Sequence, residues 1–574
     1  MIKTWGWPAP MISKRFFSGF RWLLQQPWLW LLLWGGGLLY LNHPAPSLRA
    51  DEAYYAQQAR WMLQHNNWIT IGWEGVPQVN QPPGLPWLMA WSYHWFGYSE
   101  LTVRLPATVA AAMALGLTWR VGQRLLPPLS GLWGAAILAV LPLWIQASKL
   151  GTPDMLGVAL PLLGIWALLH SEDHPQRRLS GGLGAGIAFS AGFLVSGVMA
   201  VLPLVALLPY LVRGRHSHHH LQNPGLYCGL GLGAIPTGIW LGRTVARHGV
   251  EALYPLVSQF RLLGLPPGAG APAITLEPTA RLSYYLWHLP LTTLPWVLLT
   301  LVGAWLVGRN PQVGRRTLWL GYPVVLLVGL SLVEPRHGSY ALPIYPFMAL
   351  LAAVGLHYLG RLYRSAAPSR YRVALALGWG LGVLAMGLIS AGLALLLTPG
   401  ELMSPELRLY GWVGLLGGIG GLVPWIIGLN RQGRITLLQQ WLWQGGWLVG
   451  PWLGLAAVFL TGLWGNYSPD IKQALHTGAI ASTLAHNRVH VVSLPDAPLP
   501  GAVFDQSHTM ILLTAYTPYL GELLTHWQDL PSETYAWVNV QAVLLDNLDH
   551  EVIGTVDDWQ LLRAPFDRLL TPRG

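Results

Sequence analysis

Long apolar segments alternate with short polar ones up to about residue 465 of the chain. A helix that spans a membrane needs about 20 mostly apolar residues, and thirteen segments approach that length. They lie near 27–42, 104–122, 128–146, 153–170, 181–195, 197–212, 224–241, 285–307, 317–333, 342–360, 373–397, 410–429 and 440–462. The pattern predicts an α-helical polytopic membrane protein with about 13 transmembrane helices.

Composition supports lipid as the solvent for most of the chain. Of the 574 residues, 53% are hydrophobic and 10% are charged, whereas soluble domains carry about 25% charge. The formal net charge is +10, but the basic residues form short clusters between apolar segments instead of a patch or stripe. We therefore expect membrane lipids, and not a nucleic acid, as the partner of these charges.

The positions of Lys and Arg predict the orientation, because cytoplasmic loops hold an excess of them. With the N-terminus inside, 19 of the 29 Lys and Arg residues before position 465 lie in cytoplasmic loops and ten lie outside. The first apolar stretch has no small-residue cleavage site, so we expect no cleavable signal peptide. The prediction is a plasma (inner) membrane protein with a cytoplasmic N-terminus.

The long apolar segments end near residue 464, and the sequence after them is more polar. This change predicts two domains, a transmembrane domain at 1–464 and a polar domain at 465–574. Four β-rich runs, at 489–494, 510–516, 534–540 and 551–559, alternate with helical stretches such as the one around 474–486. This alternation predicts a soluble α/β domain, and thirteen spans place it on the extracytoplasmic side. It carries no motif that can be attached to chemistry.

Two predicted outside loops, 43–103 and 242–284, are long, and long loops are usually functional. The first loop opens with Asp51 and Glu52 at the mouth of the first span, where carboxylates are costly unless they are solvated or used. From Glu52 to about Leu63 the pattern predicts an amphipathic helix in the membrane interface, with Tyr54, Tyr55 and Trp61 at head-group depth. Asp51 is then either an N-cap or a working carboxylate.

The order of motifs resembles a known family. Asp51-Glu52, Asn80-Gln81-Pro82-Pro83, Phe96-Gly97 and Arg104-Leu105-Pro106 follow one another in the first outside loop. Asp154 at the mouth of the fourth span, the run 336–346 and the aromatic run 284–290 continue the pattern. Together they resemble the GT-C superfamily of integral membrane glycosyltransferases, in the branch of the aminoarabinose transferases of lipid A and the protein O-mannosyltransferases.

The resemblance implies an inverting enzyme that moves a sugar from a polyprenyl-phosphate donor to a lipid, glycan or protein acceptor at the outer face. Inversion needs a carboxylate that removes the acceptor proton, and Asp51 is the candidate base. Asp154, which we expect to pair with Lys149, orients the acceptor, helps to bind a metal or forms an interfacial ion pair. Glu52 is a second site carboxylate or a solvated first-turn residue favoured by the helix dipole.

The departing lipid phosphate needs positive charge or hydrogen-bond donors. Arg336, His337, Tyr340 and Tyr345 are the candidates, although Arg336 also fits an interfacial anchor. Gln81 stands where the family has a lysine that faces the phosphate, so a fixed cation is missing there. Either other groups hold the phosphate, among them Arg243, Arg247, Arg261 and Arg281, or the substrate differs, or activity is lost.

A divalent metal ion is the one cofactor that the sequence suggests. The second long loop lacks the family's Glu-His pair, but His248, Glu277 and His288 lie nearby, and His with carboxylate oxygen suits a metal. The run His216–His220 also has metal-binding composition, although its place beside Arg213 and Arg215 favours a solvated cytoplasmic loop.

Two other classes compete with the enzyme. A secondary transporter tends to show repeated halves and ionisable residues near the bilayer midplane, whereas the charges here gather at the predicted outer surface. A non-enzymatic scaffold would use its C-terminal domain to bind a partner. A shared outer-surface site built from Asp51, Asp154 and Arg336 would favour the enzyme over both.

Overall fold

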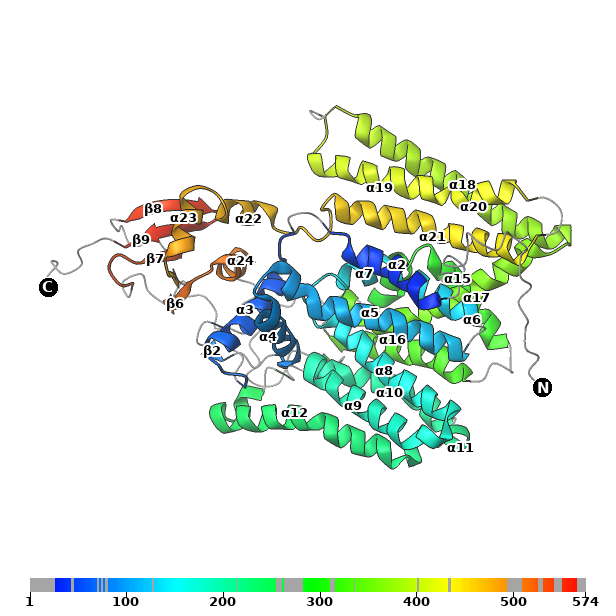
Figure 1. Cartoon of the computed structure of the whole chain (residues 1–574), viewed down its shortest axis with the longest axis horizontal. Helices are drawn as coiled ribbons and strands as arrows, with labels where there is room; N and C mark the ends of the chain where they lie inside the picture. The colour runs from blue at the N-terminus through cyan, green and yellow to red at the C-terminus, as the bar shows by residue number, and fades with distance from the viewer. Residues whose placement is uncertain are drawn as a thin grey trace, which may run out of the picture.

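The structure is a computed structural model of the whole chain (Figure 1). It describes residues 26–42, 46–69, 72–73, 76–77, 81–125, 128–213, 215–253, 256, 261–262, 282–309, 315–334, 336–399, 402–431, 435–492, 508–524, 530–540 and 550–564. Within these ranges, a bundle of helices occupies most of the molecule, and a small sheet lies beyond one end of it.

Helices occupy all thirteen of the predicted apolar segments. The bundle helices are α2 (Pro27–Tyr40), α5 (Glu100–Leu125), α6 (Pro128–Ala139), α7 (Pro142–Ala147), α8 (Asp154–Asp173), α9 (Arg178–Ser196), α10 (Val201–Arg213), α12 (Pro224–His248), α14 (Tyr284–Thr292), α15 (Trp296–Arg309), α16 (Tyr322–Leu332), α17 (Tyr345–Arg364), α18 (Pro368–Leu397), α19 (Pro405–Gly421), α20 (Val423–Leu429) and α21 (Leu437–Leu460). Many begin with proline at the first helical position, where its missing N–H costs nothing.

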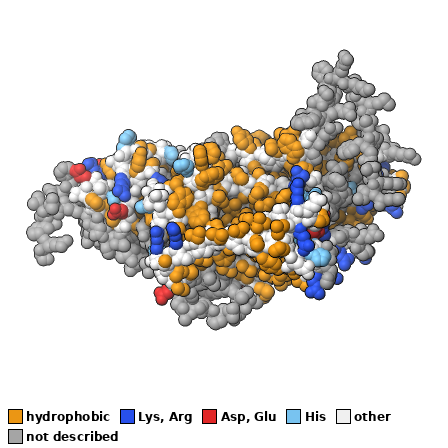
Figure 2. Space-filling model, turned by 60° about the horizontal axis from the view of Figure 1, so that its bottom comes forward, with side chains coloured by type: hydrophobic (Ala, Val, Ile, Leu, Met, Phe, Trp, Pro, Cys, Tyr) orange, Lys and Arg blue, Asp and Glu red, His pale blue; other side chains and the backbone are white. Residues whose placement is uncertain are grey.

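The chain is an integral membrane protein. Among the described residues, seven helical segments are long and apolar enough to cross a membrane, or eight if the bent pair α14 and α15 forms one span. Figure 2 shows a broad apolar band whose edges carry Lys and Arg side chains. The number of thirteen spans stays a prediction, since α2, α6 and α16 are shorter than a bilayer requires.

One of these seven segments, Pro175–Arg213, is a hairpin of two helices. Arg178 at the start of α9 donates Nη2 to the carbonyl of His219, just beyond the end of α10, at 2.6 Å. The two helices therefore begin and end at the same end of the bundle. The chain reverses at Gly197, whose φ of 55° lies in the region that favours glycine.

Burial separates inner helices from those that face lipid. In the most apolar stretch of the segment that contains α17, 78% of the residues are buried, and in that of α8 the share is 67%. In α18 only 17% of these residues are buried. Close helix contacts depend on glycine: a Cβ at Gly303 of α15 would lie 1.9 Å from the Leu351 carbonyl of α17. Another at Gly355 of α17 would lie 2.4 Å from the Leu299 carbonyl, so the two backbones meet face to face.

The first long loop folds into helices α3 (Ala50–Gln64) and α4 (Gly84–Phe96), with the short antiparallel pair β1 (Gly72–Trp73) and β2 (Val76–Pro77) between them. The helix predicted from Glu52 to Leu63 is confirmed, whereas its position in the membrane interface stays a prediction. Tyr54 is fully buried and Tyr55 is 8% exposed, because α4 and the C-terminal region cover α3.

The C-terminal region contains a five-stranded sheet in the order β6-β5-β7-β9-β8. Its strands are β5 (Val489–Val492), β6 (Leu520–Leu524), β7 (Tyr535–Asn539), β8 (Glu551–Val556) and β9 (Trp559–Arg563), and its helices are α22 (Pro469–Leu475), α23 (Gly478–His486) and α24 (His508–Tyr516). Strand β5 is parallel to β6 and β7, while β9 is antiparallel to β7 and β8.

The α/β character of this region agrees with the prediction, but one predicted strand is wrong. The run 510–516 belongs to helix α24, whose apolar residues Ile511 and Leu512 join the main core while Leu513 joins the core of the sheet. A short apolar run fits a buried helix as well as a strand, so periodicity alone did not decide. The domain boundary near residue 465 stays a prediction.

Polar contacts attach the C-terminal region to the first loop. Arg60 of α3 donates Nη1 to the Thr517 carbonyl at 2.7 Å, and the Tyr516 hydroxyl accepts from the Leu48 amide at 2.8 Å. Tyr98 donates its hydroxyl to the Ala515 carbonyl at 3.0 Å. The C-terminal end of α24 and the residue after it therefore hold α3, the helix that carries Asp51, together with Leu48 before it and Tyr98 beyond α4.

Candidate functional site

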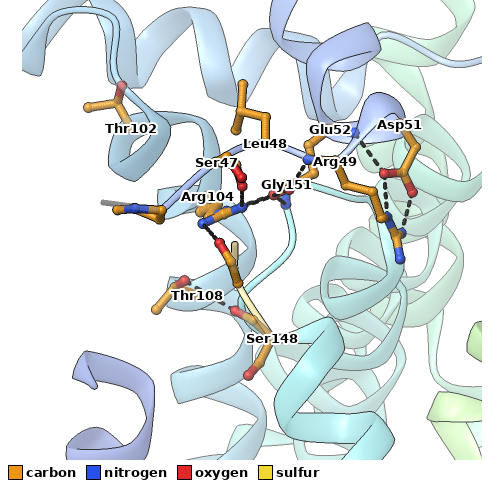
Figure 3. A network of polar contacts seen from close by, with 12 residues as sticks. Ser47, Leu48, Arg49, Asp51, Glu52, Thr102, Arg104, Thr108, Ser148 and Gly151 are labelled. Carbon is orange, nitrogen blue, oxygen red and sulfur yellow. Dashed lines mark hydrogen bonds and ion pairs between the residues drawn. The ribbon is translucent and has the colours of Figure 1, made fainter. Parts of the chain in front are cut away.

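Asp51 lies in the first turn of α3, where Arg49 holds it (Figure 3). The Arg49 guanidinium donates Nε to Oδ1 at 2.6 Å and Nη2 to Oδ2. The prediction that Asp51 is the N-cap of α3 is wrong, because the N-cap is Arg49. The Glu52 side chain accepts a hydrogen bond from the Arg49 amide at 2.9 Å. The Asp51 side chain remains 29% exposed, so a substrate can reach it.

Glu52 is the buried centre of a polar network (Figure 3). Arg104 donates Nε to Oε1 at 2.8 Å and Nη2 to Oε2 at 2.9 Å. The amide of Gly151 donates to Oε1 at 2.8 Å. With the Arg49 amide on Oε2, both oxygens of Glu52 accept two hydrogen bonds each, and the side chain is fully buried. This arrangement favours a structural role for Glu52 over the predicted catalytic one.

Tyr55 lies one turn along α3 from Asp51, and its phenol interacts electrostatically with Asp51, Asp154 and Tyr340. Burial of the Tyr55 phenol raises its pKa well above the ordinary value, and the negative charges of Asp154 and Asp51 raise it further. Asp154 begins α8, where Thr152 donates its hydroxyl to Oδ2 at 2.8 Å. Two predicted site carboxylates and a predicted phosphate ligand thus act electrostatically on one phenol.

Lys149 does not pair with Asp154, which corrects the expectation from sequence. Its ammonium donates to the Leu41 carbonyl and lies 3.9 Å from the centroid of the Phe459 ring. Burial lowers the pKa of Lys149 to about 7, and the nearby Arg104 charge lowers it further. Lys149 therefore contacts the end of α2 and helix α21, and it does not neutralise Asp154.

Arg336 lies in the segment between α16 and the short helix η6 (Gly338–Ile344). Its side chain is buried, with Nε donating to the Ser331 carbonyl at 3.0 Å and Nη1 to Glu334 Oε1 at 3.2 Å. Glu334 belongs to β4 (Val333–Glu334), which pairs with β3 (Arg261–Leu262) of the second long loop. A buried, paired guanidinium does not fit the alternative of an interfacial anchor.

Aromatic side chains connect this segment to α14. Tyr285 donates its hydroxyl to the His337 carbonyl at 3.0 Å, and Tyr340 lies within 5.8 Å of the His337 ring, measured between centroids. Tyr345 shares a hydrogen bond of 2.6 Å with Thr292. Tyr340 thus connects the two halves of the predicted site, since it neighbours His337 and acts electrostatically on the Tyr55 phenol.

The remaining candidates are dispersed. Gln81 is half-buried ahead of α4. His248 ends α12 and is exposed, His288 stacks on Tyr284 with ring centroids 4.9 Å apart, and Glu277 lies outside the described residues. Within the described ranges, no three His, Cys, Asp or Glu side chains gather into a group that could hold a metal. The residues that are described do not fit a metal site, and the metal stays a prediction.

The sequence pattern predicted only an interfacial position for Tyr55. It predicted no role in the site for Arg49 or Arg104. Tyr55 follows Asp51 by four residues, a spacing that puts two side chains on one helix face; this signal was available. Arg104 was quoted only as part of a motif. Its partnership with Glu52 depends on a contact across 52 positions, which a single sequence does not reveal.

Comparisons with known proteins agree with this architecture. A family model described as dolichyl-phosphate-mannose-protein mannosyltransferase matches residues 80–240. Undecaprenyl phosphate-alpha-4-amino-4-deoxy-L-arabinose arabinosyl transferase of Pseudomonas paraeruginosa is 29% identical over 378 residues, which are 64% of this chain and 65% of that protein. A Pseudomonas aeruginosa protein of the same name is 30% identical over 348 residues, 59% of this chain and 61% of that one. The matches thus span less than two thirds of these relatives.

The solved structure of ArnT from Cupriavidus metallidurans bound to undecaprenyl phosphate superposes with a TM-score of 0.70 at 16% identity, covering 97% of this chain and all of that one. The chain therefore shares the fold of that structure. The family model over residues 80–240 and the arabinosyl transferase relatives agree with the resemblance seen in the motifs. The chain is therefore similar in sequence to the undecaprenyl-phosphate arabinosyl transferases and, over residues 80–240, to the protein mannosyltransferase family, and similar in fold to the solved ArnT structure.

Proposed function

We propose that this chain is an inverting glycosyltransferase that moves a sugar from a polyprenyl-phosphate donor to an acceptor hydroxyl of a lipid, glycan or protein. The observation that carries the proposal is the Asp51 carboxylate, which is 29% exposed beside the Arg49 guanidinium and which, like Asp154, acts electrostatically on the Tyr55 phenol. Relatives named for arabinosyl transfer from undecaprenyl phosphate, and a fold neighbour bound to that lipid, support the donor class.

Asp51 is the general base of the proposed reaction. Its carboxylate removes the proton of the acceptor hydroxyl, and the acceptor oxygen forms a bond to the anomeric carbon. The bond from that carbon to the phosphate oxygen breaks, and its electron pair leaves with the lipid phosphate. Because attack and departure occur on opposite faces, the anomeric configuration inverts. Asp154 and Asp51 both act electrostatically on the Tyr55 phenol, and in this proposal Asp154 and the Tyr55 hydroxyl orient the acceptor.

Arg49 is the cation that this chain offers where Gln81 replaces the family's lysine. Its guanidinium is 37% exposed and already lies beside the proposed base, so it can turn from Asp51 to an arriving phosphate. That exchange would free the carboxylate when the donor binds. His337 and Tyr340 supply further donors on the other side of the site, while Arg336 positions their segment through Glu334. No step depends on a metal ion.

The orientation belongs to the same proposal. The excess of Lys and Arg in alternate loops supports a cytoplasmic N-terminus in the plasma (inner) membrane and an extracytoplasmic C-terminal region. Because α3 contacts that region directly, the site would lie at the outer face, where lipid-linked sugars are used. An acidic site at one end of the bundle, without repeated halves, favours this activity over transport.

The proposal is tested by mass spectrometry of envelope lipids and glycans from a strain that lacks the gene. We expect one glycoconjugate to lose a glycosyl unit and one polyprenyl-phosphate sugar to accumulate, and the wild-type gene to reverse both changes. The Asp51→Asn gene should reverse neither, although its product reaches the membrane in normal amount. Unchanged glycoconjugates, or full rescue by Asp51→Asn, would favour a transporter or a scaffold.

A further inference from the structure

A groove opens between α8 and α9 at the end of the bundle away from Asp51 and Asp154. It has a volume of about 300 Å³, and its lining includes Leu163, Trp166, His170, Arg177, Ser180 and Gly184. Helix α8 begins at Asp154, and its groove residues run from Leu163 to His170, so the groove lies about 14–24 Å from Asp154 along the helix axis. It is a separate feature of the molecule.

The lining changes from polar to apolar in the same direction on both helices. On α8, His170 at the mouth is followed inward by Trp166 and Leu163. On the other wall, Arg177 directly precedes α9 and is followed along that helix by Ser180 and Gly184. On each wall, this change from polar to apolar residues extends over about 10 Å. A polar mouth at the bundle end and an apolar wall toward its middle match an amphiphile that lies along the membrane normal.

The polar groups at the mouth are hydrogen-bond donors. Arg124 donates Nη2 to His170 Nδ1 at 2.7 Å, and since arginine can only donate, His170 is neutral there and carries its proton on Nε2. Trp166 Nε1 is buried without a hydrogen-bond partner among the described residues. Arg177 is exposed and forms no ion pair within the part of the chain that the structure describes. Such donors select an anion.

The neighbouring carboxylates do not neutralise Arg177, because they already have partners. Glu172 accepts from Arg315 Nε at 2.6 Å and from His220 Nε2 at 2.9 Å. Asp173 pairs with Arg124 and, at 2.9 Å, with Arg315 Nη2. The mouth of the groove is thus left with a net positive charge.

We propose that this groove binds an anionic phospholipid, with its phosphate at Arg177 and His170 and one acyl chain along Leu163 and Gly184. Charge complementarity selects the anionic head group, and the apolar wall selects a lipid over a soluble anion. The site is independent of the proposed transferase reaction, since it shares no residue with the candidate active site.

Native mass spectrometry of the full-length protein tests this binding. Delipidated protein is incubated with dioleoylphosphatidylglycerol or with zwitterionic dioleoylphosphatidylcholine, and retained lipid is counted. We expect retention of the phosphatidylglycerol, reduced about tenfold in Arg177→Ala, the loss typical of one charge-assisted hydrogen bond. Gly184→Trp should reduce it as well, because a Cβ there meets no atom within 4 Å and the indole would fill the groove.

Two matched controls separate the groove from the general surface. Gly231→Trp adds the same side chain at another open helix position, on α12, and Arg213→Ala removes another exposed arginine at the end of α10. Both should retain phosphatidylglycerol like the wild type. Wild-type retention in Arg177→Ala and Gly184→Trp, or equal retention of the zwitterionic lipid, would overturn the proposal.

Discussion

Arg104 donates hydrogen bonds to both carboxylate oxygens of Glu52, from Nε to Oε1 at 2.8 Å and from Nη2 to Oε2 at 2.9 Å. Both side chains are almost completely shielded from solvent. The pair joins the first turn of α3 to α5. Arg104 also donates to the carbonyls of Ser47 and Gly465, so it ties the C-terminal region to the same point. Glu52 thus supports the backbone from which its neighbour Asp51 reaches the site.

We expect Glu52→Ala to destabilise the fold by about 3–5 kcal/mol, the usual cost of leaving a buried charge without its partner. Thermal unfolding of the purified protein in detergent measures this loss. Replacing both members, with Glu52→Met and Arg104→Met together, should recover part of it. Asp51→Ala is the matched control: its partner Arg49 is 37% exposed, and such pairs contribute about 1 kcal/mol or less. Equal losses at both positions would contradict the structural role of Glu52.

Asp51→Asn should lose activity but keep its stability, the reverse of the main effect expected for Glu52→Ala. The amide keeps the shape of the carboxylate but cannot accept the acceptor proton, so we expect transfer to fall by about 10²–10⁴-fold with little change in thermal stability. Product formation by purified protein, followed by mass spectrometry, measures the fall. Asp470→Asn in the exposed first turn of α22 is the control and should keep full activity. A stable Asp51→Asn protein with wild-type turnover would remove the proposed base.

The sequence predicted the helices well because lipid imposes one rule on every span: about 20 apolar residues must pass through it. It also predicted that Asp51 and Asp154 share one end of the bundle, because topology alone fixes the side. The pairing of Lys149 was wrong because the distance to Asp154 depends on how α7, α8 and α21 pack. Burial of Tyr54 and Tyr55 was missed because it depends on the C-terminal region, more than 400 positions further on.

Arg60→Ala should loosen the attachment of the C-terminal region to α3. Arg60 donates to the carbonyls of Thr517 and Pro518, and unsatisfied acceptors of this kind cost about 1–3 kcal/mol each. We expect faster hydrogen exchange in α3 and around residues 515–518, measured by mass spectrometry. Arg488→Ala, on an exposed arginine within the C-terminal region, should leave α3 unchanged. Unaltered exchange in Arg60→Ala would mean that other contacts hold the two parts together.

Lys149 should make the stability depend on pH above neutrality. Burial lowers the pKa of its amine from 10.5 to about 7, so between pH 7 and about 10.5 the unfolded chain binds a proton that the folded chain does not. Stability therefore rises with pH in this window. We expect the midpoint of thermal unfolding to increase from pH 7 to pH 9 in the wild type and to increase less in Lys149→Met. The same pH dependence in both proteins would assign it to other groups.

Gly303→Ala tests the contact between α15 and α17 with the smallest possible change. A Cβ at this position would lie 1.9 Å from the Leu351 carbonyl oxygen, and backbone cannot turn aside as a flexible side chain can. The helices must separate, and overpacking of this kind costs about 1–3 kcal/mol. Gly238→Ala on α12 is the control, because its Cβ meets no atom within 4 Å and alanine is the better helix former by about 1 kcal/mol. Unfolding in detergent should therefore move in opposite directions for the two variants. A Gly303→Ala protein as stable as the control would show that α15 and α17 do not approach this closely.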